Sequence, residues 1–302
     1  MRRLELADQM DVLIGQCGAR PVQYKFSHAP ILVLFGRDRG APRRDVRFRT
    51  RSSARVAAAW PSREAYRALM PYAQVDDVSL YYEVHGAPDA PPLVLICGLA
   101  LDISEIGLIV EGLAARYRVL TFDNRGAGRS DKPDAPYTVE LMAADTAGVM
   151  RSVGLPRAAV VGLSMGGRIA LALTLAEPDM VSRLILVSTG PRVLRTWRRR
   201  LLHLAAPVLV ARGRYPQPRY AFARQAAASG AYDATARLGE IRVPALVLHG
   251  RGDKTAPLVL AEQMCAALPD ATMRTFPGGH LFMLMGQREQ FIAAVLDQTP
   301  AV

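Results

Sequence analysis

The chain has 302 residues, of which half are hydrophobic and 22% are charged, with a formal net charge of +11. This composition is typical of a soluble globular protein with one large domain or two small ones, and no apolar run reaches the roughly 18 residues that a membrane span needs. The three cysteines, Cys17, Cys97 and Cys265, have the spacing of neither a zinc site nor a disulfide framework, so we expect free thiols in a reducing, cytoplasmic compartment.

Most of the positive charge lies near the N-terminus. Residues 1–69 contain 14 basic and 6 acidic residues, which gives this segment +8 of the total. Its Arg-rich stretch, 37–55, lacks the aromatic interleaving and the motifs of nucleic-acid-binding segments, so we expect no nucleic-acid partner. No hydrophobic period is sustained here. We interpret 1–69 as an N-terminal extension. A disordered arm and a transit peptide are alternatives, but we favour sequence upstream of a natural start at Met70, because a regular pattern begins immediately after it.

From Met70 onward, segments typical of strands and of helices alternate. The strand-like segments are 78–86, 91–98, 117–123, 157–164, 181–189, 243–250 and 271–279, and the helix-like segments are 103–115, 138–153, 165–176, 258–268 and 287–298. This alternation predicts an α/β domain over 70–302 with an open, mostly parallel sheet covered by helices. Ligands of such sheets bind at the carboxyl ends of the strands.

The alternation breaks once, at about 191–240. This insertion contains ten arginines but only two acidic residues, Asp233 and Glu240. We expect a small helical cap over the site. An arginine can bind a carboxylate with two parallel hydrogen bonds. If some of these arginines line the entrance to the site, we expect an anionic substrate.

A serine lies between glycines where a predicted strand meets a predicted helix. The stretch VVGLSMGGRIA (160–170) contains the pattern G-x-S-x-G around Ser164. In a nucleophile elbow this pattern forms a sharp strand-to-helix turn that projects the serine hydroxyl above the sheet. Ser164 is therefore the candidate nucleophile.

A serine hydroxyl needs a base to take its proton, and that base needs an acid to orient it. In an elbow fold the chain order is serine, acid, histidine, and of five histidines only His280 follows a plausible acid after a late strand. We assign the acid to Asp253, three residues past the strand that ends at Gly250. Glu262 lies within a predicted helix and Asp270 at the amino end of the last strand, so both are weaker candidates.

The developing oxyanion needs two N–H donors. Met165 follows the nucleophile at a predicted helix start, where the helix dipole assists. Leu99, in CGLALD (97–102), follows the strand that ends at Gly98. We expect the backbone N–H groups of Leu99 and Met165 to form the oxyanion hole.

The chain from about Tyr72 to its end resembles the α/β-hydrolase superfamily. Four motifs carry this resemblance: GLSMGG, DNRGAGRSD (123–131), HGRGDKTAP and GGH. The resemblance implies an eight-stranded, mostly parallel sheet flanked by helices, and a Ser-Asp-His triad without metal or cofactor. Cys97 is a departure, because members commonly have histidine before the glycine of the oxyanion loop. Haloalkane dehalogenases and soluble epoxide hydrolases of this fold use an aspartate nucleophile, which Ser164 argues against.

Within the superfamily, GLSMGG and the insertion are most similar to 3-oxoadipate enol-lactonases and related esterases. The expected reaction is therefore hydrolysis of a small-molecule carboxylic ester or lactone through an acyl-Ser164 intermediate. The alternatives are a carbon–carbon lyase similar to the menaquinone-pathway synthase, a cofactor-free perhydrolase, and a ligand receptor on a hydrolase fold. The oligomeric state stays open.

Overall fold

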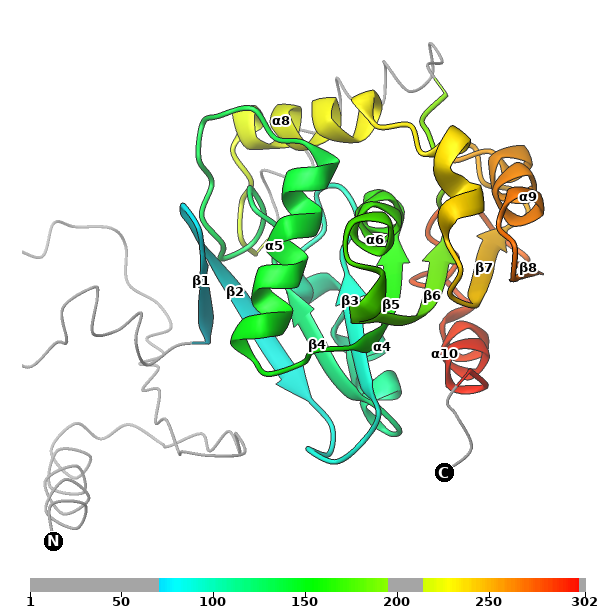
Figure 1. The fold of residues 1–302 in the computed structure, drawn as a ribbon, viewed down its shortest axis with the longest axis horizontal. Coiled ribbons are helices and arrows are strands. Elements are labelled where there is room, and N and C mark those ends of the chain that lie inside the picture. Colours follow the sequence, from blue (N-terminus) through cyan, green and yellow to red (C-terminus); the bar gives the residue numbers. More distant parts are fainter. Residues whose placement is uncertain (1–70, 195–213, 299–302) are drawn as a thin grey trace, which may run out of the picture. The chain divides into compact units, whose positions relative to one another are not determined.

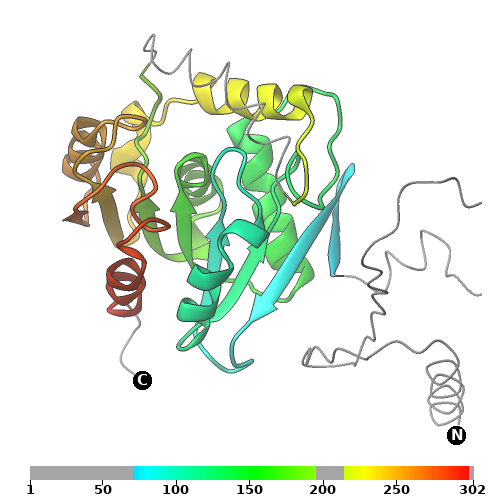
Figure 2. The ribbon, with the colours of Figure 1, turned by 180° about the vertical axis from the view of Figure 1, so that it is seen from behind.

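The computed structural model describes residues 71–194 and 214–298, and the fold of this part is shown in Figures 1 and 2. Its strands form an eight-stranded sheet in the order β1-β2-β4-β3-β5-β6-β7-β8. Strand β2 pairs antiparallel with both of its neighbours, and the strands from β4 to β8 in that order pair in parallel. The strands are β1 Tyr72–Val75, β2 Val78–His85, β3 Pro92–Ile96, β4 Arg118–Phe122, β5 Ala158–Leu163, β6 Val181–Val187, β7 Ala245–Gly250 and β8 Ala271–Phe276.

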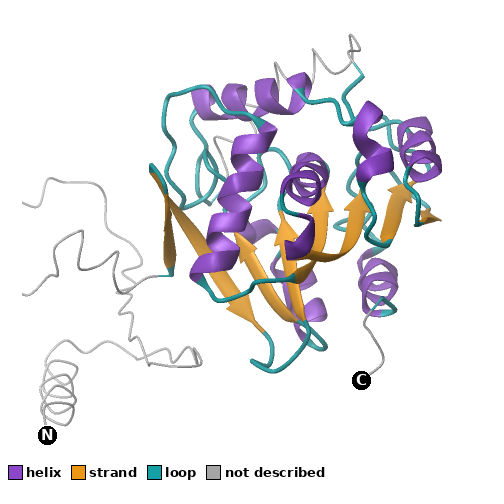
Figure 3. Ribbon diagram, in the orientation of Figure 1, coloured by secondary structure: helices purple, strands orange, loops and turns teal. Residues whose placement is uncertain are grey.

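Helices cover both faces of the sheet (Figure 3). Apolar side chains of α5, α6 and α9 belong to one hydrophobic cluster, and those of α4 and α10 belong to a second cluster. The described helices are α4 Gly107–Ala114, α5 Val139–Ser152, α6 Met165–Ala176, α8 Arg219–Ala231, α9 Leu258–Ala267 and α10 Arg288–Leu296, with 3₁₀ turns at Ile103–Glu105, Pro178–Met180 and Thr235–Glu240. The predicted α/β-hydrolase architecture is confirmed.

The inner strands are mostly apolar because both of their faces are covered. All six residues of β5 and all six of β7 are buried. Successive side chains of a strand point to opposite faces. Accordingly, Val160 packs in the cluster beneath α5 and α6, whereas Ala159 and Val161 pack in the cluster beneath α4 and α10. The continuous apolar runs in the sequence reflect this two-sided burial.

Two details differ from the expected elements. Strand β1 was not predicted, because it has only four residues and its exposed Gln74 interrupts the apolar pattern. The predicted helix 103–115 is a 3₁₀ turn followed by α4. Asp102 caps that turn by accepting a hydrogen bond from Ser104 N, while the Glu105 side chain accepts one from Asp102 N. This capping box stabilises the short turn as a separate unit.

The described part of the predicted insertion contains α8. In Figure 1 this helix lies across the ends toward which the parallel strands point. Two glutamines attach it to the loop after β4: Gln217 donates to the Gly126 carbonyl and Gln225 to the Arg125 carbonyl. The insertion arginines Arg195, Arg198, Arg199, Arg200 and Arg212 lie outside the described residues, as do the predicted extension 1–69 and Met70.

No helix of the described ranges 71–194 and 214–298 is both long enough and apolar enough to cross a membrane.

Candidate active site

Ser164 lies between β5 and α6 with φ 53° and ψ −110°, a strained conformation for a residue with a side chain. The flanking glycines permit this sharp turn. A Cβ on Gly162 would lie 2.5 Å from the Gly166 carbonyl oxygen, and a Cβ on Gly166 would lie 2.3 Å from the Ile96 carbonyl oxygen. Side chains at these two positions would collide with backbone, so the elbow requires the glycines that the sequence pattern predicted.

Ser164, His280 and Asp253 form one hydrogen-bonded chain. His280 Nε2 lies 2.9 Å from Ser164 Oγ, and His280 Nδ1 lies 2.8 Å from Asp253 Oδ2. An ionised carboxylate only accepts hydrogen bonds, so Nδ1 donates to Asp253 and Nε2 is left to accept from the serine hydroxyl. This arrangement suits proton transfer from Ser164 to His280.

The Asp253 carboxylate is held in place by backbone. Its side chain is fully buried, and Oδ1 accepts hydrogen bonds of 2.8 Å from the N–H groups of Thr255 and Ala256. Oδ2 therefore faces His280. The loop that carries Asp253 meets the loop that carries His280 through glycines, since Gly252 N donates to the Gly278 carbonyl at 2.8 Å. A Cβ on Gly250 would lie 2.3 Å from the Gly279 carbonyl oxygen, so only glycine permits this approach.

The two predicted oxyanion donors lie on either side of the serine. Met165 is the first residue of α6, where a helix N–H has no partner within the helix. Leu99 follows Gly98, and a Cβ on Gly98 would lie 3.3 Å from Ser164 Cβ, so this loop passes directly beside the nucleophile. Neither N–H donates a hydrogen bond to another residue of the described part of the chain. Both N–H groups therefore lie next to the nucleophile position and have no described acceptor.

Residues after β4 hold the loop after β3, which carries Leu99, in position. Asn124 Nδ2 donates to the Cys97 carbonyl at 3.0 Å, and the buried Asp123 carboxylate accepts from Ile103 N at 2.8 Å. Burial raises the pKa of Asp123, although hydrogen bonds from backbone N–H groups oppose this shift. Cys97 is fully buried, and burial raises the pKa of its thiol well above the usual range. Its backbone, rather than its side chain, carries the hydrogen bond at this position.

A second histidine packs behind the acid. His249, at the end of β7, is fully buried, and its Nε2 lies 2.8 Å from the Ala256 carbonyl oxygen and 3.4 Å from Asp253 Oδ2. No described group hydrogen-bonds to its Nδ1. Burial lowers the pKa of His249, against the opposing effects of the Ala256 carbonyl and the Asp253 carboxylate. The ring is therefore neutral and donates from Nε2.

The lowered pKa of His249 predicts a loss of stability in acid. The unfolded chain binds a proton at this residue below about pH 6.5, whereas the folded chain binds it only at lower pH, so stability falls as pH decreases through this window. The free energy of unfolding, measured with urea, is expected to change less with pH in His249→Gln than in wild type, because glutamine does not titrate. The difference between the two slopes is at most about 1.4 kcal/mol per pH unit. The control is His85→Gln on β2, a half-exposed histidine beside Glu83. Parallel pH curves for His249→Gln and wild type would contradict the prediction.

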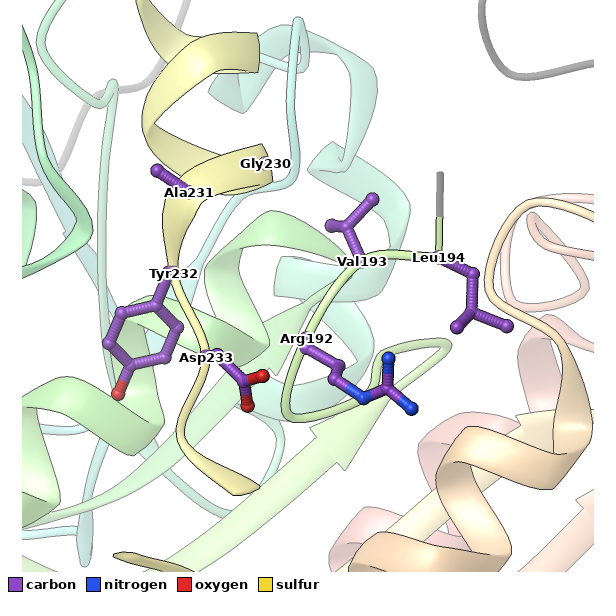
Figure 4. Close-up of a pocket in the computed structure, with 7 residues that line it drawn as sticks. All are labelled: Arg192, Val193, Leu194, Gly230, Ala231, Tyr232 and Asp233. Atoms are coloured by element: carbon purple, nitrogen blue, oxygen red, sulfur yellow. The ribbon is translucent and has the colours of Figure 1, made fainter. Parts of the chain in front are cut away.

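Two arginines border the hollow at the serine. Its lining includes Ser164, His280, Arg168 and Arg192, together with Thr255 and apolar side chains. Arg192, Val193 and Leu194 also line an adjoining cavity of about 390 Å³, which is shown in Figure 4. Neither Arg168 nor His249 was singled out from the sequence. For Arg168 a signal was present, because a residue four positions after Ser164 lies on the same helix face.

Comparisons with known proteins agree with the α/β fold described above. The α/β hydrolase fold family matches residues 91–217. The protein named "Putative carbamate hydrolase RutD" of Azorhizobium caulinodans is 31% identical over 247 residues, which cover 70% of this chain and 92% of that protein.

Among solved structures, the enol-lactonase of Burkholderia xenovorans LB400 is 28% identical with a TM-score of 0.67, covering 75% of this chain and 98% of that one. The esterase of Exiguobacterium antarcticum is 22% identical with a TM-score of 0.68, covering 77% of this chain and 100% of that one, and its likeness concerns the fold alone. On these grounds the chain belongs to the α/β-hydrolase superfamily, as a hydrolase on that fold.

Proposed function

We propose that this protein is a serine hydrolase that cleaves a small-molecule carboxylic ester or lactone through an acyl-Ser164 intermediate. The observation that carries the proposal is the unbroken chain Ser164–His280–Asp253, with separations of 2.9 and 2.8 Å, beside the N–H groups of Leu99 and Met165. The similarity to an enol-lactonase supports a lactone or ester substrate.

The proposed reaction assigns a defined task to each of these groups. Ser164 Oγ attacks the carbonyl carbon while His280 Nε2 takes the hydroxyl proton, and the charge on the former carbonyl oxygen is stabilised by the Leu99 and Met165 N–H groups. Collapse of this intermediate breaks the carbon–oxygen bond, and His280 returns the proton to the leaving alcohol. Water then adds to the acyl-serine by the same route and releases the acid. Asp253 keeps the His280 ring oriented and stabilises its protonated form.

A carbamate is the second candidate substrate. The relative in Azorhizobium caulinodans is named for carbamate hydrolysis, and its sequence is 31% identical to this one. A carbamate carbonyl accepts the same nucleophile and needs the same oxyanion donors. Steady-state kcat/KM for a carbamate, measured beside the matching ester and lactone, decides between these substrates.

Detection of the acyl-enzyme tests the proposal. With p-nitrophenyl acetate, we expect a burst of p-nitrophenol close to one equivalent of enzyme, and acetylation of the peptide that contains Ser164 in an acid-quenched sample analysed by mass spectrometry. A carbon–carbon lyase that uses the triad only as a base, or an inert receptor, would give neither result. A perhydrolase would give the burst but would consume the acyl-enzyme faster with hydrogen peroxide than with water. Unlabelled Ser164 during active turnover would refute the proposal.

A further inference from the structure

The backbone of Ser164 is held at both of its polar groups by the end of the neighbouring strand. Strands β5 and β6 pair in parallel, so their carboxyl ends lie at the same edge of the sheet (Figure 1). Ser164 N donates to the Val187 carbonyl at 2.8 Å, and the hydroxyl of Thr189, two residues past β6, donates to the Ser164 carbonyl at 2.7 Å. Thr189 is fully buried. A side chain that the triad does not use therefore holds the strained backbone of the nucleophile.

The Ser164 carbonyl and the Met165 N–H belong to the same peptide group. This group is planar and trans, so its carbonyl oxygen and its N–H point in opposite directions. The carbonyl oxygen accepts from the Thr189 hydroxyl and, at 3.1 Å, from Gly167 N. A rotation of the peptide plane moves both of its ends together. A hydrogen bond that fixes the Ser164 carbonyl therefore also fixes the direction of the Met165 N–H.

Thr189 packs directly on the first turn of α6. A Cβ on Gly167 would lie 2.5 Å from Thr189 Cγ2 and 2.8 Å from Thr189 Oγ1, so a side chain here would displace the threonine. Gly167 is the last glycine of GLSMGG and lies outside the G-x-S-x-G pattern. Its lack of a side chain leaves room for the Thr189 hydroxyl to reach the Ser164 carbonyl.

This hydrogen bond acts on the proposed oxyanion hole in two ways. A donor stabilises the developing charge best when its direction is fixed before the reaction, because no reorganisation is then needed. In addition, hydrogen bonds in a chain polarise one another, so a peptide whose carbonyl accepts a hydrogen bond is a stronger donor at its N–H. Neither effect involves a formal charge or a titrating group.

We infer that Thr189 is a positioning residue for the oxyanion donor: its hydroxyl fixes the peptide between Ser164 and Met165 so that the Met165 N–H faces the tetrahedral intermediate. The inference rests on the proposed acyl-transfer function and adds a residue that acts through the backbone of the nucleophile. Because the oxyanion exists only after attack, the hydroxyl should affect the acylation rate and not the binding of the ester.

The test is Thr189→Val, which replaces the hydroxyl by a methyl group of similar size. The Ser164 carbonyl keeps its hydrogen bond from Gly167 N, so the substitution leaves no buried acceptor unpaired. With p-nitrophenyl acetate in single turnover, we expect acylation to slow about 10-fold, less than the roughly 10²- to 10³-fold loss on removal of a whole oxyanion donor, because the N–H remains. The dissociation constant of the ester should stay within about twofold of wild type.

Two further measurements separate this role from a purely structural one. Phenylboronic acid forms a tetrahedral adduct with a catalytic serine, and its affinity should fall in Thr189→Val by about the same factor as the acylation rate. The pH dependence of acylation should match that of wild type, because His280 and Asp253 are unaltered. Thr189→Ser, which keeps the hydroxyl, should acylate at close to the wild-type rate.

The matched control is Thr174→Val. Thr174 is also buried, lies on α6 itself, and donates from its hydroxyl to the Ala170 carbonyl at 2.8 Å. Its variant loses the same kind of hydrogen bond away from the peptide after Ser164, so its acylation rate should stay at the wild-type value. Circular dichroism and unfolding curves establish folding. If Thr189→Val does not fold, Thr189→Ala removes the hydroxyl in a smaller side chain and is measured in its place.

The inference and the proposed function can fail separately. Wild-type acylation in the variant without the hydroxyl, or an equal loss in Thr189→Ser or Thr174→Val, would overturn the inference and leave the proposed function standing. If the wild-type enzyme forms no acyl-Ser164 from the ester, the proposed function is refuted and the inference falls with it.

Discussion

Replacement of Ser164 by alanine is expected to reduce kcat for ester hydrolysis by about 10⁴- to 10⁶-fold, because the members of a triad act as one unit. His280→Ala should cause a loss of similar size, and the double variant should lose little more than either single one. The residual rate would come from the N–H groups of Leu99 and Met165 and from substrate binding. Single-turnover kinetics with p-nitrophenyl acetate measures the acylation step directly.

Ser188 provides a matched control for this variant. It follows β6 as Ser164 follows β5, and the two serines share a left-handed backbone, with φ of 46° and 53°. Ser188 is fully buried, and no described group hydrogen-bonds to its Oγ. Ser188→Ala should retain activity, and both variants should show wild-type circular dichroism, since alanine keeps the Cβ. A Ser164→Ala enzyme within tenfold of wild type would remove Ser164 from the role of nucleophile.

The parts of the site that were predictable are those that depend on the position of a residue relative to a strand end. Parallel strands align their carboxyl ends at one edge of the sheet, so residues just past β5, β7 and β8 come together although they lie far apart in the chain. This reasoning selected Ser164, Asp253 and His280 before any distance was known. The roles of the Leu99 and Met165 N–H groups stay a prediction, which was made because backbone donors depend on the course of the chain rather than on side-chain identity.

The parts that were not predictable depend on packing between elements. Arg168 meets Ser229 across 61 positions of sequence, and no periodic pattern relates α6 to α8. Asn124 reaches the Cys97 carbonyl only because β4 lies beside β3 in the sheet. His249 has the residue type of a catalytic base, but it lies within a buried strand, where its ring is neutral and faces the Ala256 carbonyl. These contacts follow from strand order and helix docking, which composition and spacing do not determine.

The arginines of the insertion also show that the sequence alone does not determine where a charged side chain lies. Ten arginines over 50 residues suggested a cationic cap, yet the described ones have different roles. Arg224 pairs with Asp134 and Arg237 with Glu240 on the surface, while Arg192 borders the hollow at the serine. Exposed pairs of this kind contribute little to stability, because water and salt screen the attraction between the charges. Only the fold identifies which arginines are near the site.

Asp253→Asn is expected to lower kcat about 10³- to 10⁴-fold with little change in the fold. The asparagine Oδ1 can still accept the hydrogen bonds from Thr255 and Ala256, so the side chain keeps its position. Its Nδ2 group then faces His280 and donates, which forces Nδ1 to become an acceptor and leaves the proton on Nε2. A ring protonated at Nε2 cannot take the proton of Ser164 Oγ, so acylation is the step that slows.

Two other acidic residues serve as controls for this variant. Glu262 lies on α9 and Asp270 immediately precedes β8, both outside hydrogen-bonding distance of His280 among the contacts of the described residues. Glu262→Gln and Asp270→Asn should therefore keep acylation rates within about twofold of wild type, because surface substitutions rarely disturb a distant site. Rates are compared in single turnover, after unfolding curves have established equal folding. The assignment of the acid to Asp253 would be wrong if Asp253→Asn acylated at a nearly normal rate while Glu262→Gln or Asp270→Asn did not. The residue whose variant lost acylation would then be the acid of the triad.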